Sequence, residues 1–225
     1  MRIFIVMGLP YQGKTTTARE LLAQLRAHPL YQDREIGYVS TDKCRGKLLK
    51  EEYPDDKVYK YTAIQEAQAW RVFLAEVVTF LTLSPPNGIL IIDGTLSQWS
   101  KMCELLDILT VNIEAFATQR LPLVIEFVYV GSQYGERMWL PSMLPLQNET
   151  INGRWKSRCM ENEAIGLSGE VPEAVLNRKK EEMQETLNML VSTCKCFMKS
   201  YRGLIYFARH FLRHHPKAQE IHKII

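Results

Sequence analysis

The chain has 225 residues, of which 46% are hydrophobic, and a formal net charge of +3 at pH 7. This length and composition predict a single domain over residues 1–225 that buries a sizeable core. The small charge does not demand an acidic partner. The apolar segment 72–83 is interrupted by Glu76 and is too short for a membrane span of about 20 residues.

The cysteines and the N-terminus indicate a cytoplasmic, soluble protein. The five cysteines form no C-x-x-C pair, so neither a zinc site nor a disulfide framework is expected. Lys14 comes too early for the N-terminal apolar run to act as a signal peptide.

Apolar runs that are typical of strands alternate with segments of helical period. Strands are expected at residues 2–7, 35–40, 89–92, 123–130 and 203–208. Helices are expected at residues 14–27, around 70–81, 101–117, 172–199 and, as a basic C-terminal helix, about 209–225. Uniformly apolar strands separated by helices predict an α/β fold, a three-layer α/β/α sandwich around a mainly parallel sheet.

Polar segments follow three of the expected strands directly, at residues 8–16, 41–45 and 93–95. Ligands of parallel α/β sheets bind beyond the carboxyl ends of the strands. These three segments are therefore expected to lie near one another and to form the functional site.

The first segment, Gly8-Leu-Pro-Tyr-Gln-Gly13-Lys14-Thr15, matches the phosphate-loop pattern G-x-x-x-x-G-K-[ST]. Backbone N–H groups and a helix N-terminus would hold phosphates, Lys14 would neutralise their charge, and Thr15 would ligate Mg²⁺. The residues expected to bind the nucleotide are Gly8, Tyr11, Gln12, Gly13, Lys14, Thr15 and Thr16.

The second segment carries Asp42 and Arg45. A carboxylate that faces a phosphate loop can act as a general base toward an attacking hydroxyl, and a guanidinium can grip an anionic acceptor. The alternative for Asp42 is a plain helix N-cap, for which Asp is a favoured residue.

The third segment places Asp93 after four apolar residues. Together with Thr15, this carboxylate would support Mg²⁺, directly or through a water. The alternative is an ordinary turn aspartate before Gly94.

Arg154 and Arg158 would lie on one face of a helix, because they are four residues apart. Their segment, about 148–165, is a candidate lid whose guanidinium groups stabilise the transferring phosphate. A solvated charged helix paired with nearby glutamates is the competing interpretation, and the two stay open.

The motifs GLPxxGKTT, STDxxR and IIDGT, followed by the arginine segment, resemble the phosphate-loop (P-loop) kinase family of polynucleotide kinases and zeta toxins, an AAA-type ATP-binding kinase domain. The resemblance runs from about residue 2 to 178. It implies a five-stranded parallel sheet in the order 2-3-1-4-5. It also implies that Asp42 activates the acceptor hydroxyl, that Arg45 engages the acceptor, and that Arg154 and Arg158 belong to a lid.

The sequence departs from that family at two places. Tyr11-Gln12 stands where Gly-Ser is usual, and Leu96 stands where an Asn often follows the third strand. No D-x-D-x-T phosphatase motif occurs, so a bifunctional end-healing enzyme is not expected.

These observations predict an ATP-dependent, Mg²⁺-requiring kinase of a hydroxyl acceptor, which is either a small molecule or a nucleic acid. Two alternatives remain: a zeta-toxin-like kinase of a nucleotide sugar, and a nucleotide-binding switch without phosphotransfer. The basic C-terminal segment could contact nucleic acid or close the core as a helix.

Overall fold

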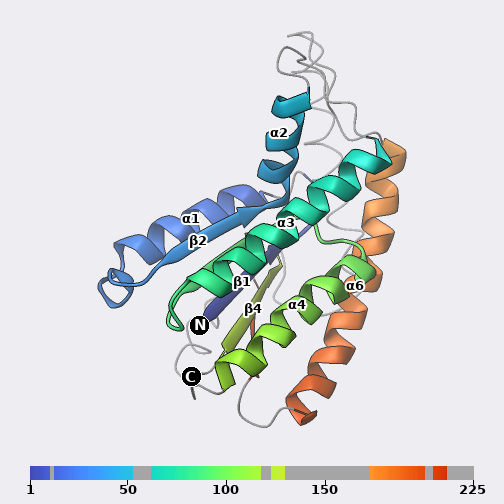
Figure 1. Ribbon diagram of the computed structural model, residues 1–225. Coiled ribbons are helices and arrows are strands. Elements are labelled where there is room, and N and C mark those ends of the chain that lie inside the picture. The colour runs from blue at the N-terminus through green and yellow to red at the C-terminus, as the bar shows by residue number, and fades with distance from the viewer. Residues whose placement is uncertain (11–12, 53–61, 118–122, 130–172, 201–204, 212–225) are drawn as a thin grey trace.

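The computed structural model describes residues 1–10, 13–52, 62–117, 123–129, 173–200 and 205–211 (Figure 1). In chain order its elements are β1 (Arg2–Met7), α1 (Lys14–Ala27), η1 (Pro29–Tyr31), β2 (Ile36–Ser40), α2 (Thr41–Glu52), α3 (Ala63–Leu83), β3 (Ile89–Asp93), α4 (Trp99–Ala117), β4 (Leu123–Tyr129), α6 (Glu173–Ser200) and β5 (Ile205–Phe211).

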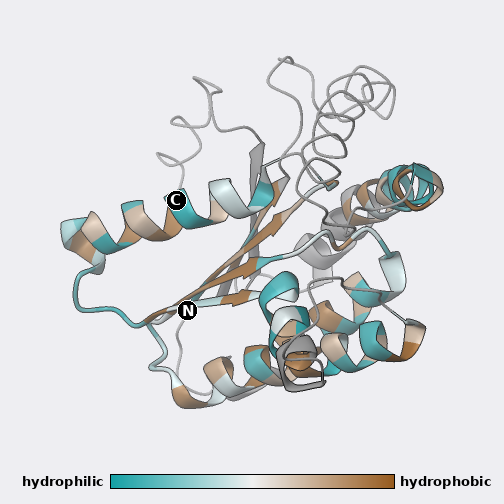
Figure 2. Cartoon of the chain, turned by 90° about the horizontal axis from the view of Figure 1, so that it is seen from above, coloured by the Kyte–Doolittle hydropathy of each residue, from teal (hydrophilic) through white to brown (hydrophobic). Residues whose placement is uncertain are grey.

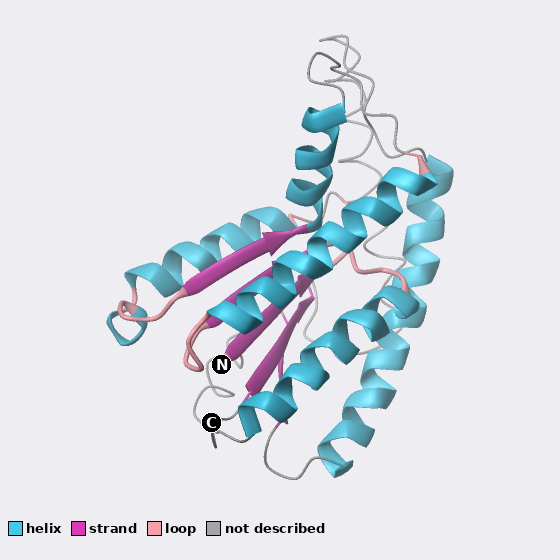
Figure 3. Cartoon of the chain, in the orientation of Figure 1, coloured by secondary structure: helices cyan, strands magenta, loops and turns pink. Residues whose placement is uncertain are grey.

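The strands form one parallel sheet in the order β2-β3-β1-β4-β5 (Figure 3). Asp93 at the end of β3 pairs with Ser40 on one side and with Val6 on the other. The predicted α/β class with a parallel sheet is confirmed. The register brings the segments after β1, β2 and β3 to the same edge of the sheet.

Side chains alternate along the strands and so supply two separate cores. Ile3, Ile5 and Met7 belong to a cluster that α3, α4 and α6 complete, whereas Phe4 and Val6 pack against α1. Figure 2 shows hydrophobic strands running between helices on both sides. Because both faces are covered, the strands are apolar throughout and do not alternate with polar residues.

The long helix α3 begins and ends at local sequence signals. Thr62 caps it: the Thr62 side chain accepts from the Gln65 N–H, and the Gln65 side chain accepts from the Thr62 N–H. This capping box satisfies N–H groups that the first helical turn leaves without partners. The helix ends at Leu83, and its C-cap residue Ser84 precedes Pro85. The periodicity over residues 70–81 therefore marked only the middle of a 21-residue helix.

Two elements differ from the sequence-based expectation. Residues 41–52 form the helix α2 directly after β2, where the main expectation was a polar segment and a helix capped by Asp42 was the alternative. The C-terminal helix expected from about residue 209 is wrong at its start, because residues 209–211 continue β5 beside β4. Residues 212–225 lie outside the described part of the chain.

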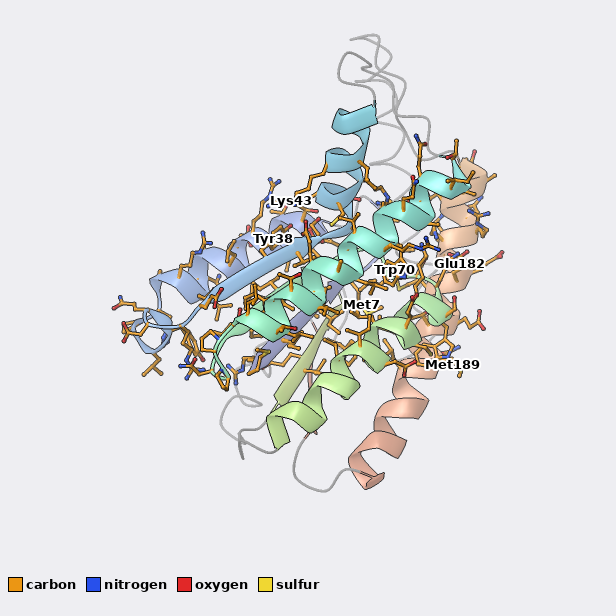
Figure 4. All side chains as sticks on the ribbon, in the orientation of Figure 1. Met7, Tyr38, Lys43, Trp70, Glu182 and Met189 are labelled. Atoms are coloured by element: carbon orange, nitrogen blue, oxygen red, sulfur yellow. The ribbon has the colours of Figure 1, made fainter. Side chains whose placement is uncertain are left out.

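The middle of α6 is joined to the segment after β3 by buried and half-buried polar contacts. The Ser97 hydroxyl donates to Glu182 Oε2 at 2.9 Å, and the Thr186 hydroxyl donates to the Ser97 carbonyl at 2.6 Å. Glu182 also accepts from Lys179 at 2.8 Å, and Figure 4 labels it on α6. Among the described helices, none is both long and apolar enough to cross a membrane.

Candidate functional site

The loop between β1 and α1 depends on two glycines with positive φ. Gly8 has φ 154°, and Gly13 has φ 87° in the left-handed region as the N-cap of α1. Side chains other than glycine are strained in such conformations. Because Gly13 has no side chain, the N-cap residue itself makes no side-chain hydrogen bond to the first turn of α1. Tyr11 and Gln12 lie outside the described residues.

Lys14 begins α1 and points inward. The residue is only 9% exposed, and its Nζ donates a hydrogen bond to the Leu9 carbonyl at 2.9 Å. Burial lowers the pKa of Lys14, while the charges of Asp42 and Asp93 act in the opposite direction. The lysine therefore lies within electrostatic reach of both carboxylates that the sequence singled out.

Asp42 lies in the first turn of α2, immediately beyond the end of β2. Its side chain is 72% exposed, and its Oδ1 accepts from Arg45 Nη1 one helical turn on. A carboxylate at a helix N-terminus is stabilised by the helix dipole. Because α2 begins at Thr41, Asp42 lies within the first turn and is not the N-cap that the alternative interpretation expected, and its exposed carboxylate is open to a ligand.

Arg45 is held from the other side by Glu66 of α3. Its Nε donates to Oε2 and its Nη2 donates to Oε1, both at 2.7 Å. Lys101 of α4 also reaches Glu66 Oε1, at 3.3 Å. Burial disfavours the Glu66 carboxylate, but the hydrogen bond and charge of Arg45, helped by Lys101, hold its pKa below the ordinary value.

Asp93 is 2% exposed and accepts a hydrogen bond from the neighbouring strand. The Tyr38 hydroxyl on β2 donates to Asp93 Oδ2 at 2.7 Å. Lys43 of α2 lies over the Tyr38 ring, with its Nζ 4.4 Å from the ring centroid (Figure 4). Burial raises the pKa of Tyr38, and the hydrogen bond to Asp93 raises it further.

The donor set suits a hard cation held mainly by a nucleotide. Thr15 is half-buried in the first turn of α1, and the Asp93 carboxylate stands at the end of the adjacent strand β3. Mg²⁺ prefers oxygen ligands and commonly takes one or two from the protein, the rest coming from phosphates and water. Within the described ranges, no group of three His, Cys, Asp or Glu side chains could hold a metal by itself.

The structure brings together the predicted residues of all three strand ends, namely Gly8, Gly13, Lys14, Thr15, Thr16, Asp42, Arg45 and Asp93. The predicted lid residues Arg154 and Arg158 lie outside the described residues.

Sequence reasoning did not find Tyr38, Glu66 or Lys101. Tyr38 could have been found, because alternate residues of a strand share a face and Tyr38 lies two residues before Ser40, which is paired with Asp93. Glu66 and Lys101 could not, because their contacts depend on how α2, α3 and α4 pack together.

A strand, a glycine-containing G-x-x-x-x-G-K-[ST] loop and a helix at the centre of a parallel sheet define the P-loop class of α/β folds. No protein-family model matches the chain, and no curated protein matches it either.

Several solved structures are similar in part. Chaetomium thermophilum Kti12 in complex with ADP-AlF3 is 18% identical, with a TM-score of 0.39, over 83% of this chain and 99% of that one. Mycobacterium tuberculosis APS kinase CysC, as a Cys556Ala mutant, is 13% identical, with a TM-score of 0.35, over 60% and 77%. APE1195 is 13% identical, with a TM-score of 0.41, over 85% and 96%. All three TM-scores are below 0.5, so the fold class rests on the chain's own sheet and loop.

Proposed function

We propose that the chain is an ATP-dependent kinase that transfers the terminal phosphate of ATP to a hydroxyl acceptor with the help of Mg²⁺. The observation that carries this proposal is the electrostatic grouping at the sheet edge. Lys14 of the phosphate loop is buried within reach of Asp42, an exposed carboxylate, and Asp93, a buried one. A phosphate-binding lysine, a candidate base and a candidate metal-supporting carboxylate are the parts that phosphoryl transfer needs.

Each residue would have a distinct task. The loop N–H groups and Lys14 would hold the β- and γ-phosphates, with Lys14 leaving the Leu9 carbonyl to do so. The oxygen of the acceptor hydroxyl would bond to the γ-phosphorus, and Asp42 would accept the proton that this hydroxyl loses. The bond from that phosphorus to the bridging oxygen breaks, and ADP leaves. When bound at Thr15 and Asp93, Mg²⁺ would neutralise charge on the phosphate oxygens.

The lid residues in this proposal are inferred from the sequence alone. Arg154 and Arg158 would close over the γ-phosphate and stabilise its equatorial oxygens. The acceptor is defined only by its hydroxyl. A nucleic acid, a nucleoside, a nucleotide sugar and a simple sugar all satisfy that requirement, and the nucleotide sugar corresponds to the zeta-toxin-like alternative.

One observation favours a second candidate, a nucleotide-binding switch without phosphotransfer. The Asp42 carboxylate already accepts from Arg45, and Arg45 is itself engaged by Glu66. In a kinase, the acceptor has to compete with Arg45 for Asp42. In a switch, this contact simply persists when ATP binds.

The test is calorimetry with ATP and Mg²⁺, followed by radiolabel transfer from ATP to RNA, DNA, nucleoside, sugar and nucleotide-sugar acceptors. The Lys14→Ala variant should lose both ATP binding and transfer, whereas Asp42→Asn should lose transfer and keep ATP binding. ATP binding without transfer to any acceptor would support the switch. Full transfer by Asp42→Asn contradicts the assignment of Asp42 as the base.

A further inference from the structure

We infer that Tyr38 is a positioning residue for the metal-supporting carboxylate Asp93 and thereby sets the affinity of the ATP-bound site for Mg²⁺. The inference rests on the proposed function, since it concerns the same nucleotide site. It adds a residue of the edge strand β2 that none of the recognised motifs contains.

The first support is geometric. Tyr38 and Asp93 lie on neighbouring parallel strands, with Ser40 paired to Asp93 and Tyr38 two residues earlier on the same face. The Tyr38 hydroxyl reaches along this face to Asp93 Oδ2 at 2.7 Å, which is the length of a strong O–H···O⁻ hydrogen bond. Asp93 is 2% exposed, so water has little access to replace this donor.

The second support is that the Tyr38 ring is itself held in place. Lys43 lies over the ring at 4.4 Å from its centroid, and the ring is half-buried against the α1 side of the sheet (Figure 4). A cation above a partly buried aromatic ring is attracted by its π-electrons. Tyr38 therefore presents its hydroxyl from a fixed ring and restricts the rotation of the Asp93 carboxyl group.

The third support is the direction of the hydrogen bond, in which the Tyr38 hydroxyl donates and the Asp93 carboxylate accepts. A donor that holds one carboxylate oxygen leaves the other oxygen to meet a metal-bound water.

We expect the removal of the Tyr38 hydroxyl to change the affinity for Mg²⁺ and not the affinity for ATP. Groups that orient a metal-supporting carboxylate typically change metal affinity by about 10-fold to 100-fold when they are removed. Tyr38 lies in β2, outside the phosphate loop, so we expect the binding of metal-free ATP to be unaffected by its substitution. A residue with a purely structural role would lower thermal stability without this selectivity.

The experiment measures ATP binding by calorimetry in excess EDTA and over a series of Mg²⁺ concentrations. Tyr38→Phe keeps the ring beneath Lys43 and removes only the hydroxyl, and Tyr38→Leu removes both the ring and the hydroxyl. The matched control is Tyr31→Phe, because the Tyr31 hydroxyl accepts from Arg2 at 3.1 Å at the amino end of β1, away from Asp93. Melting temperatures are recorded for every variant.

We expect the Mg²⁺ midpoint for ATP binding to rise by about 10-fold in Tyr38→Phe and Tyr38→Leu and to stay unchanged in Tyr31→Phe. In an Asp93→Asn background, Tyr38→Phe should add nothing, since it acts through Asp93.

An unchanged or lower midpoint, an equal loss of ATP binding in EDTA, or a full effect in the Asp93→Asn background overturns the role of Tyr38. Wild-type protein that binds no ATP at any Mg²⁺ concentration overturns the proposed function as well, so the two failures are distinguishable.

Discussion

Arg45 of α2 and Glu66 of α3 form a two-point ion pair, with Nε–Oε2 and Nη2–Oε1 distances of 2.7 Å each. Because the third guanidinium nitrogen, Nη1, contacts Asp42, Arg45 presents all three nitrogens to carboxylates. An anionic acceptor that binds Arg45 would have to displace one of them. Glu66, which takes two of the three nitrogens, and Asp42, which takes the third, therefore together determine how available Arg45 is.

Glu66→Gln should change stability in a pH-dependent way. The pKa of Glu66 is lower in the folded than in the unfolded chain, so its carboxylate stabilises the fold above the unfolded value, about 4.3. That contribution is lost as the pH falls through the folded value. The side chain is 36% exposed, so solvent screening limits the effect to about 0.5–1 kcal/mol.

Urea unfolding between pH 3 and pH 7 measures this effect. At pH 7 the free energy of unfolding of wild type should exceed that of Glu66→Gln, and this difference should shrink toward pH 3. Glu181→Gln, on the exposed side of α6, is the control and should leave the profile unchanged. A difference that grows in acid contradicts the ion pair.

Lys14→Met should separate nucleotide binding from folding stability. Burial lowers the pKa of Lys14, which means that the charged lysine is less favourable in the fold than in the unfolded chain. Methionine has an unbranched side chain like that of lysine but carries no charge. The melting temperature of the variant should therefore be equal to or above that of wild type. ATP with Mg²⁺ should raise the melting temperature of wild type and not that of the variant. A strongly lowered melting temperature of the variant would show that Lys14 chiefly maintains the loop.

Gly37→Ala and Gly46→Ala should have opposite effects on stability. A Cβ at Gly37 would lie 2.5 Å from two ring carbons of Phe80, so overpacking between β2 and α3 should cost about 1–3 kcal/mol. A Cβ at Gly46 within α2 meets nothing within 4 Å. Alanine there should stabilise the helix by about 0.5–1 kcal/mol. Thermal unfolding measures both, and equal shifts in one direction would contradict the packing described.

Thr186→Val should loosen α6 from the segment after β3. The hydroxyl donates to the buried Ser97 carbonyl at 2.6 Å, and its removal leaves that carbonyl unsatisfied at a cost of about 1–3 kcal/mol. Thr82→Val is the matched control, since the Thr82 hydroxyl bonds to the carbonyl four residues earlier at an exposed site. Its effect should stay within about 0.5 kcal/mol. Equal effects in urea unfolding would refute a special role for the Ser97 contact.

The parallel sheet was predictable because its strands are buried on both faces and leave long apolar runs such as residues 89–92. The phosphate loop was predictable because its glycines and lysine have fixed spacing. The helix α2 was not the main expectation because its sequence is mostly polar, and among its described side chains Cys44 is the one that belongs to the buried core.

The partners of the predicted site residues could not be derived from sequence patterns. The contacts of Arg45 with Glu66 and of Asp93 with Tyr38 join residues 21 and 55 positions apart. Local spacing carries no information at that range. The assigned functions of Asp42, Arg45, Asp93, Arg154 and Arg158 stay predictions.

The helix α2 begins at the residue after β2 ends, with no linker between them, and rises away from the sheet (Figure 1). A rotation of α2 about this junction displaces each residue in proportion to its distance from Thr41. Asp42 is one residue, or about 1.5 Å of helix axis, from that pivot, whereas Glu52 is about 16 Å away. A small tilt of α2 would therefore leave the Asp42 carboxylate almost in place, and the ion pairs of Arg45 with Glu66 and of Lys47 with Glu76, which join α2 to α3, limit how far the helix can tilt.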